Sequence, residues 1–560
     1  MSRDILTLDP PLLADAAALE SYLGSYPNVF VEQGYPAISL DAWRALGEDA
    51  GEPAYATARS LGLPLVRLDR ISADADALGL IPPNLARRLR AVPLRVRKGM
   101  VAVAMEEPGG PDAQRLLDFL SRERVLPMVA SPLQIRMAIG RHYDQAEDRA
   151  MARQLGLDTS ITDEQSPSEQ EAQRLALEMP VVSMVHTLIA EAVARRASDI
   201  HLRPGEDATD VLYRIDDELV PVRRLARALN PAVVSRIKVL AGMNLAEHRK
   251  PQDGRTTFRI NGDQSVDLRI SLLPSVHGES IVIRLLDTSQ SLWNLDQLGL
   301  SAADRQRIED VMARSHGMFL ATGPTGCGKS TTLYAMLLEL RKQRINILTI
   351  EDPVEFHIAD IQQMQVNRAA GFTFASAMRN FLRHDPDVVM VGEIRDRETA
   401  DIAVESALTG HLMLSTLHTN TAATTVTRLL DLGVEPYLLR TSLLAVISQR
   451  LVRLTCQYCK HEEDVPTHMR EELGIAADEV FHVGRGCHHC EGLGVFRRQA
   501  VYELLVMSPR LRRLVVPGAD AEALHAAAIT EGMVPITQAA LALARSGVIS
   551  LAEAWRVRAD

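Results

Sequence analysis

Cysteine is scarce in this sequence, which has 560 residues and only five cysteines. This low content argues against a disulfide-stapled fold, the solution used by small secreted domains with too few apolar residues to build a core. Here the hydrophobic content is 46%, which is enough for several cores and excludes wholesale disorder. At about 150 residues per domain, the length predicts three or four domains.

Long apolar runs and aromatic side chains are also missing. No run reaches the roughly 18 residues that a membrane-spanning helix needs, and the N-terminal stretch MSRDILTLDPPLLADAAALE lacks the apolar centre of a signal peptide. We therefore expect a cytosolic protein that contacts a membrane only through a partner. The net charge of −11 and the aromatic fraction of 4% argue against a nucleic-acid-binding protein, which needs basic patches and stacking platforms.

The spacing of apolar residues changes along the chain and indicates separate domains. The N-terminal part mixes helical spacing with short strands, and a polar, acidic stretch after it predicts a linker, with an exposed helix as the alternative. A helix followed by alternating strands comes next. Short apolar runs then alternate with helical segments, which is typical of a doubly wound α/β domain. We expect an N-terminal domain at residues 1–145, a linker at 146–172 and a second domain at 173–290. The third domain would comprise residues 291–560, with its final helices at 505–560.

The stretch GPTGCGKS, residues 323–330, matches the G-x-x-x-x-G-K-[ST] motif of a phosphate-binding loop. It follows the apolar run MFLAT and precedes the helical run TTLYAMLLEL, which is the strand–loop–helix context that the motif requires. Backbone amides and the helix N-terminus would bind phosphates, Lys329 would reach the β- and γ-phosphates, and Ser330 would ligate Mg²⁺. The predicted nucleotide-binding residues are Gly323, Pro324, Thr325, Gly326, Cys327, Gly328, Lys329, Ser330 and Thr331.

Acidic residues follow two further apolar runs, at the strand ends where a doubly wound sheet binds its ligands. NILTIEDPVE places Glu351 there, and DVVMVGEIRD places Glu393 just after Gly392. We expect Glu393 to hold Mg²⁺ through water or to polarise the attacking water, and Glu351 to be a second catalytic acid. A helix cap or a surface charge is the alternative for each of them.

Two histidines flank the apolar run in TGHLMLSTLHTN, His411 before it and His418 after it. Seven residues of extended strand span about 23 Å, so the two side chains cannot touch one γ-phosphate. Because ligands bind at the carboxyl ends of the strands in such a sheet, we assign the γ-phosphate-sensing role to His418. We assign a structural or interface role to His411, and a structural histidine is the alternative for both.

Four of the five cysteines form two C-x-x-C pairs with 27 residues between them. Four thiolates at this spacing can close a tetrahedral Zn²⁺ site that leaves no position open for water, so we predict a structural metal site in a subdomain at residues 454–497. A redox pair is the alternative, but it would need a thioredoxin-like context that the sequence lacks. The predicted zinc ligands are Cys456, Cys459, Cys487 and Cys490.

Taken together, these stretches resemble the secretion ATPases of the type II secretion and type IV pilus superfamily. GPTGCGKST resembles the Walker A motif of that family, TIEDPVE its aspartate box, VMVGEIRD its Walker B motif and TGHLMLSTLHTN its histidine box. ASDIH and PQDGR resemble signatures of its second N-terminal domain, and the cysteine pairs match its zinc-bearing branch. The resemblance covers about residues 173–505 and is greatest to the type II secretion branch. Asp217 stands where the family usually has glycine.

The resemblance implies a fold, cofactors and partners. The fold would be α/β, with a RecA-like P-loop motor domain, a PAS-like α/β second N-terminal domain, a small α+β first N-terminal domain and the tetracysteine zinc subdomain. The enzyme would be a homo-hexameric ATPase that uses ATP, Mg²⁺ and Zn²⁺, with Arg255 and Arg269 as arginine fingers and Arg284 as a third candidate. Its first domain would dock on the cytoplasmic domain of an inner-membrane secretion protein, near a polytopic platform protein, on the cytoplasmic face of the bacterial inner membrane.

The expected function is therefore ATP hydrolysis that drives pseudopilus assembly and protein export by a type II secretion system. A type IV pilus assembly ATPase is the main alternative, and cyclic di-GMP regulation is less expected because RSLGLPLVRL fits the arginine-leucine-glycine motif poorly. A retraction motor is disfavoured by the long N-terminal region and the cysteine extension. A helicase or zinc-ribbon nucleic-acid protein is disfavoured by the net charge, and a nonhydrolytic scaffold by the presence of Lys329, Glu393 and His418.

Overall fold

The computed structural model divides the chain into two compact units, a first and a second unit. The first consists of Met1–Asp287, Cys456–Cys459 and Gly484–Val495, and the second of Thr288–Thr455, Lys460–Val483 and Phe496–Asp560. Most of the predicted linker at 146–172 lies outside the described residues. The structure describes residues 10–25, 52–97, 99–109, 115–116, 119–120, 124–144, 155, 169–260, 265–286, 293–490 and 492–558.

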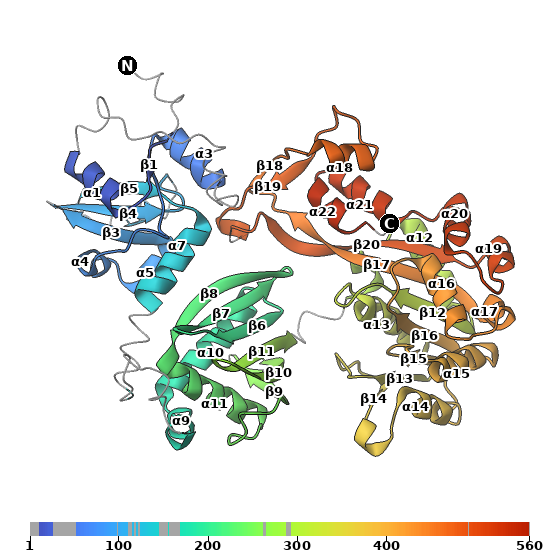
Figure 1. The fold of residues 1–560 in the computed structure, drawn as a ribbon. Coiled ribbons are helices and arrows are strands. Elements are labelled where there is room, and N and C mark those ends of the chain that lie inside the picture. The colour runs from blue at the N-terminus through green and yellow to red at the C-terminus, as the bar shows by residue number, and fades with distance from the viewer. Residues whose placement is uncertain are drawn as a thin grey trace. The chain divides into compact units, whose positions relative to one another are not determined.

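A five-stranded mixed sheet in the order β1-β2-β5-β4-β3 forms the N-terminal part of the first unit (Figure 1). Strands β3 and β4 pair antiparallel, and the other neighbours pair parallel. Nearly all of β4 is buried, because it lies inside the sheet among packed helices. The strands are β1 (Leu12–Leu13), β2 (Leu65–Val66), β3 (Ala91–Arg97), β4 (Met100–Met105) and β5 (Arg124–Val129), and the helices are α1 (Ala16–Ser25), α3 (Glu52–Leu61), α4 (Ala75–Leu78), α5 (Pro83–Leu89) and α7 (Pro132–Ile139).

The rest of the first unit is built on a six-stranded antiparallel sheet in the order β8-β7-β6-β11-β10-β9. Alternate residues of each strand point to one face, and the apolar ones pack on α10 and α11 in one core. The elements are α9 (Glu169–Leu175), α10 (Met179–Ala194), α11 (Asn230–Ala241), β6 (Asp199–Pro204), β7 (Ala208–Ile215), β8 (Glu218–Ala226), β9 (Gln252–Arg259), β10 (Ser265–Ser275) and β11 (Gly278–Leu286).

The turn between β7 and β8 explains how Asp217 replaces the glycine that is usual in the family. Asp216 and Asp217 have φ angles of 47° and 70°, as in the two-residue turns that match the twist of antiparallel strands. Aspartate tolerates this left-handed conformation better than most residues. The hairpin therefore forms without glycine.

A seven-stranded sheet in the order β14-β13-β15-β16-β12-β17-β20 forms the centre of the second unit (Figure 1). All neighbours from β14 to β17 pair parallel. Such a sheet needs helices on both faces, which is why its strands read as continuous apolar runs. The strands are β12 (Gly317–Thr322), β13 (Ile347–Glu351), β14 (Gln362–Gln365), β15 (Val388–Val391), β16 (Leu412–Leu417), β17 (Leu443–Thr455) and β20 (Val495–Val506).

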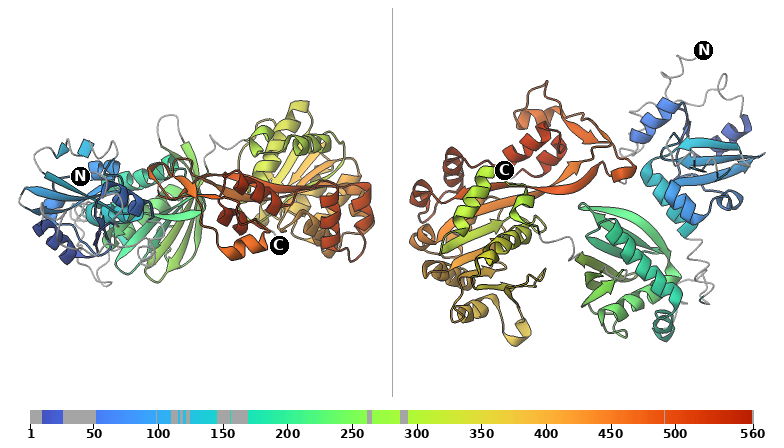
Figure 2. Two further views of the ribbon diagram at one scale, coloured as in Figure 1. Left: turned by 90° about the horizontal axis from the view of Figure 1, so that it is seen from above. Right: turned by 180° about the vertical axis from the view of Figure 1, so that it is seen from behind.

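Helices lie on both faces of this sheet (Figure 2). An apolar cluster packs on each face. Phe319 and Ala321 of β12 point into the cluster with the first two helices of the unit, and Met318 and Leu320 point into the opposite cluster. The predicted doubly wound α/β fold is thereby confirmed. The first face carries α12 (Ala302–Met312) and α13 (Lys329–Leu340), and the second carries α14 (Phe374–Phe381), α15 (Arg397–Leu408), α16 (Ala422–Asp431) and α17 (Pro436–Ser442).

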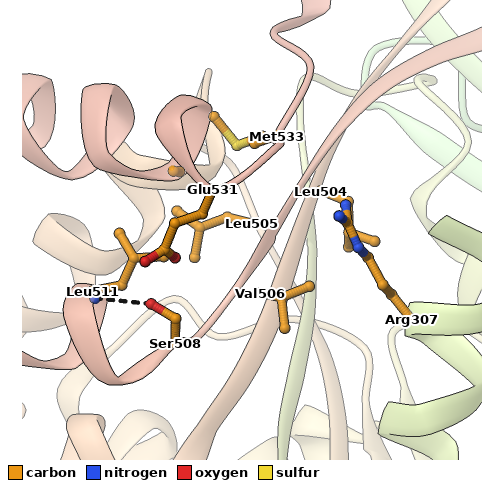
Figure 3. Close-up of a pocket in the computed structure, with 9 residues that line it drawn as sticks. Arg307, Leu504, Leu505, Val506, Ser508, Leu511, Glu531 and Met533 are labelled. Atoms are coloured by element: carbon orange, nitrogen blue, oxygen red, sulfur yellow. Dashed lines mark hydrogen bonds between the residues drawn. The ribbon is translucent and has the colours of Figure 1, made fainter. Parts of the chain in front are cut away.

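The C-terminal part of the second unit is helical after β20. A cavity of about 160 Å³ lies there, lined among others by Arg307, Leu504, Glu531 and Met533 (Figure 3). None of the predicted nucleotide-binding residues lines it, so this cavity is not the phosphate site. The helices after β20 are α19 (Pro509–Leu514), α20 (Ala521–Thr530), α21 (Ile536–Arg545) and α22 (Leu551–Arg556). Between β17 and β20 lie β18 (Lys460–Glu462), α18 (Thr467–Glu472) and β19 (His482–Gly484).

A buried ion pair between α11 and β11 gives a test of the first unit's packing. Lys238 is 0% exposed, its Nζ lies 2.7 Å from Oε1 of Glu279, and it donates a 2.7 Å hydrogen bond to the carbonyl of Glu247. Replacing Lys238 by Met leaves a buried carboxylate without this partner, so we expect a loss of about 3 kcal/mol of unfolding free energy in urea denaturation. The double variant Lys238→Met/Glu279→Leu should recover part of the loss. An equally unstable double variant would contradict this account.

Candidate nucleotide-binding and catalytic site

The predicted phosphate-binding loop begins at the carboxyl end of β12. All six residues of β12 are buried, because β16 and β17 flank the strand and helices cover both faces. Gly323 follows with a φ of 137°, and a Cβ atom there would lie 2.4 Å from the carbonyl oxygen of Gln449 in β17. Only glycine permits this approach, so contact with β17 fixes where the loop begins.

The loop leads into α13, whose first residue is Lys329. This lysine is 8% exposed, and its Nζ donates hydrogen bonds to the carbonyls of Gly323 and Pro324 at 2.8 Å and 3.0 Å. Burial lowers the pKa of Lys329, and the charge of Glu393 acts in the opposite direction. Ser330 is exposed beside it. An ammonium group, loop amides and a helix N-terminus are the donors that phosphates bind.

Gln449 in β17 holds the phosphate-binding loop in place, and no sequence pattern predicted this role. Its Nε2 donates a 2.8 Å hydrogen bond to the carbonyl of Cys327, which is 122 residues away in the chain. Its Oε1 accepts a 2.9 Å hydrogen bond from Thr332 in α13. Because Gln449 is buried, this one amide links the loop and the helix to β17 in a dry environment, where hydrogen bonds are stronger.

The structure brings Glu393 and His418 together, as their places after adjacent parallel strands predict. Oε2 of Glu393 lies 3.5 Å from Nε2 of His418 and 2.7 Å from Nε of Arg395. The Glu393 side chain is largely buried and that of His418 is half exposed. His411 lies at the other end of β16, where its Nδ1 is 3.0 Å from the carbonyl of Ser406. The catalytic role of Glu393 and the sensing role of His418 remain predictions.

Glu351 lies at the same edge of the sheet, but in a closed network. It is 4% exposed, and its carboxylate accepts hydrogen bonds from Tyr334, from Thr349 at 2.7 Å and from Gln363 at 3.2 Å. Burial raises the pKa of Glu351, and these three donors act in the opposite direction. Its role as a second catalytic acid remains a prediction. The structure adds that this carboxylate joins α13, β13 and β14.

The arginines expected to act as fingers form a row across the sheet of the first unit. Arg269 in β10 pairs in register with Arg255 in β9 and with Arg284 in β11, and side chains at paired positions share a face. Arg284, the third candidate, is held by Asp199, with Nε 3.0 Å from Oδ1. Arg255 is exposed and Arg269 is half-buried.

The four cysteines outside the phosphate loop meet at one point, as their spacing predicts. Their sulfur atoms all lie within 4.8 Å of one another. The Sγ atoms of Cys456 and Cys487, of Cys459 and Cys490, and of Cys487 and Cys490 are each 3.8 Å apart. A zinc ion bound tetrahedrally at about 2.3 Å from each sulfur places the sulfurs about 3.8 Å from one another.

Backbone amides complete the surroundings of this cluster. The amides of Gly486 and Gly494 donate to the sulfurs of Cys459 and Cys490 at 3.3 Å and 3.2 Å. A disulfide would bring two sulfurs to about 2.05 Å, and all five cysteines are free. The donor set and its spacing therefore fit a structural Zn²⁺ better than a redox pair.

A parallel sheet that brings a phosphate-binding loop and a strand-end glutamate to one edge is the arrangement of a P-loop ATPase with a RecA-like fold. Family comparison narrows this class. The chain belongs to the type II/IV secretion system protein family, whose model matches residues 175–556. A second model, the MshEN domain, matches residues 61–149.

Relatives from two kinds of system resemble this chain. It is 38% identical to the type IV pilus assembly ATPase PilB of Myxococcus xanthus over 504 residues. These residues are 88% of this chain and 89% of the relative. It is 44% identical to the type II secretion system protein E of Pseudomonas aeruginosa over 383 residues. These residues are 68% of this chain and 76% of the relative. These findings confirm the predicted superfamily and the ATPase class.

Among solved structures, the ATPase DotB of Legionella pneumophila has a similar fold. The TM-score is 0.51 with 24% sequence identity, over 66% of this chain and 94% of that chain. Within the described residues, no helix combines the length and apolarity that crossing a membrane requires.

Removing one zinc ligand tests the metal site. We expect about one zinc ion per chain in protein purified without chelator, and much less after Cys459→Ser, because four thiolates are needed to close the site. The variant should also melt at a lower temperature, since metal binding contributes to folding. Metal content by mass spectrometry and thermal unfolding are the measurements, and Cys327→Ser is the matched control. Zinc far below one per chain in the unaltered protein would rule the assignment out.

Proposed function

We propose that this chain hydrolyses ATP to assemble a pseudopilus and thereby to drive protein export through a type II secretion system. The observation that carries this proposal is the 44% identity over 383 residues to a type II secretion protein E, against 38% and 40% over 504 and 511 residues to two pilus assembly ATPases. Type IV pilus assembly is the second candidate. It is favoured by the greater length of the pilus match, which extends over 88% of the chain.

In the proposed reaction, the loop at residues 323–331 binds the phosphates of ATP through its backbone N–H groups, which every residue but Pro324 has, and through Lys329. Ser330, exposed beside Lys329, would hold Mg²⁺, which neutralises phosphate charge when bound. Glu393 orients the attacking water and accepts its proton. His418, which follows the neighbouring strand β16, contacts the γ-phosphate. Glu351 acts as a second catalytic acid at the same edge of the sheet. Lys329 and Glu393 are close enough for the charge of Glu393 to act on the lysine, which supports a shared site.

The arginine row of the first unit would supply further positive charge. An arginine finger on a transferred phosphoryl group contributes a factor of about 10³ or more to the rate. Arg284, the third candidate, forms an ion pair with Asp199. Arg255 and Arg269 are the positions that match the fingers of the family. The proposal for these two residues rests on the family resemblance and on their shared face of the sheet.

The proposed assembly follows from the family. We propose a homo-hexamer on the cytoplasmic face of the bacterial inner membrane, with no nucleic-acid partner. Its N-terminal domain would dock on the cytoplasmic domain of an inner-membrane secretion protein, near a polytopic platform protein. The proposed domain limits remain 1–145, 173–290 and 291–560, with zinc-binding and C-terminal helical parts at 454–497 and 505–560.

The Glu393→Gln variant tests the mechanism. It keeps the size of the side chain but cannot accept a proton, so we expect ATP turnover to fall by at least about 100-fold. Nucleotide binding should persist, because the phosphate loop and Lys329 are unchanged. Steady-state phosphate release and fluorescent-nucleotide titration are the measurements. Glu405→Gln, an exposed change on α15, is the control, and a Glu393→Gln protein with full turnover would refute the mechanism.

Inactivating the gene in its native host separates the two candidate systems. Loss of exported proteins from the medium with normal surface pili is the result expected for a type II secretion motor. Loss of pili with normal export would instead support the pilus assembly motor. Complementation with the wild-type gene should restore the phenotype, and complementation with the Glu393→Gln gene should not. If neither phenotype appears, both assignments fail.

A further inference from the structure

Tyr334 connects the phosphate-binding loop to the acidic segment that follows β13. It lies on α13 five residues after Lys329, which corresponds to about 7.5 Å along the helix axis, and it is buried. Its ring packs edge-on against Phe356, with centroids 6.1 Å apart and an interplanar angle of 76°. The side chain therefore reaches from the phosphate-binding helix into the segment that carries Glu351.

The hydroxyl group of Tyr334 has two partners in that segment. It donates a hydrogen bond to Oε2 of Glu351 and accepts one from the backbone amide of Glu355 at 3.2 Å. A single oxygen atom thus joins both ends of the segment 351–355. Because Tyr334 and Glu351 are buried, the loss of this hydroxyl would leave the Glu351 carboxylate short of one buried partner.

Gln363 holds the same segment from the opposite side. Its Nε2 donates to Oε1 of Glu351 at 3.2 Å and to the carbonyl of Phe356 at 3.0 Å. The two oxygens of the Glu351 carboxylate are therefore held from different elements, Oε1 from β13 and β14 and Oε2 from α13. Of these contacts, the bond to Tyr334 is the one that links the carboxylate to the helix of the phosphate loop.

We propose that Tyr334 is a positioning residue for ATP hydrolysis, through which the phosphate-binding helix holds Glu351 and the segment 351–355 in their working arrangement. This inference rests on the proposed function in one respect, the participation of Glu351. Tyr334 itself is buried. It acts by fixing the position of Glu351 and by favouring its ionised form, as a donor to a carboxylate does.

The charge state of Glu351 supplies a measurement that packing alone would not change. Burial raises the pKa of Glu351, the hydrogen bonds from Tyr334, Thr349 and Gln363 lower it, and the charge of Glu355 raises it. Removing the Tyr334 hydroxyl takes away one lowering contribution, so the pKa rises further. If ionised Glu351 is needed for turnover, the acidic limb of the kcat profile then moves to higher pH.

The test is Tyr334→Phe, which keeps the ring against Phe356 and removes only the hydroxyl. We expect kcat for ATP to fall about tenfold, as for loss of a hydrogen bond to a charged group, with a KM within about twofold of the wild type. The acidic limb of kcat should shift to higher pH. Gln363→Met, which removes the opposite donor, should shift the limb in the same direction.

Tyr213→Phe is the matched control. Tyr213 is also buried, and its hydroxyl donates a 2.7 Å hydrogen bond to the carbonyl of Leu188 in the first unit. This variant should keep the wild-type kcat and pH profile. If Tyr334→Phe changes neither kcat nor the acidic limb, or lowers kcat without moving that limb, Tyr334 is not a positioning residue.

Glu351→Gln separates this inference from the proposed function. Full turnover in Glu351→Gln would remove Glu351 from the mechanism, and the role of Tyr334 with it. A large loss in Glu351→Gln together with an unaltered Tyr334→Phe would overturn only the inference about Tyr334. Comparable losses in both, with the shifted limb in Tyr334→Phe, would support it.

Discussion

Parallel pairing of buried strands is the constraint on which the motor site depends. Strand β12 lies between β16 and β17, with every residue buried, and β15 and β13 continue the sheet in the same direction. Parallel strands end at one edge, so the segments after β12, β13, β15 and β16 meet there. Residues far apart in the chain, such as Lys329 and Glu393, become neighbours for this reason.

Several side chains at that edge are buried, and protein partners hold their polar groups. Lys329 is bonded to loop carbonyls, Glu351 has three donors, and Gln449 uses both ends of its amide. In a low-dielectric interior, such bonds are strong and an unpaired group is costly. The side chains therefore keep one arrangement, and a preorganised set of dipoles is what stabilises charge developing in a transition state.

Local patterns made part of this site predictable from the sequence. The glycines and lysine of the phosphate loop and the two cysteine pairs are spaced by local geometry, so their chemistry could be recognised without a fold. The strand-end rule then located Glu393 and His418 correctly at one edge, 3.5 Å apart. The same rule predicted that Glu351 lies at that edge, but it did not predict which side chains surround its carboxylate. As the last residue of β13, it points to the same side as Thr349, which bonds to it.

Long-range partners could not be predicted. Gln449 supports a loop 122 residues away, and Asp199 holds Arg284 across 85 residues, because strand order and register bring these pairs together. Neither strand order nor register is encoded in a short motif. Tyr334 lay within the predicted helix, but its apolar setting resembled ordinary core packing. Only the position of β13 relative to α13 reveals its polar contact.

The two units carry different charged groups at their candidate site residues. The phosphate loop contains one buried ammonium group, that of Lys329, and the charge of Glu393 raises the pKa of this lysine against the effect of burial. A lysine and a divalent cation leave the charge that spreads over the γ-phosphate in the transition state only partly matched. The arginine row on β9, β10 and β11 gathers positive charge on one face of the first unit's sheet, because cross-strand register keeps its members together. We propose that Arg255 and Arg269 supply this positive charge during hydrolysis, because a fixed arginine stabilises the charge on a transferred phosphoryl group.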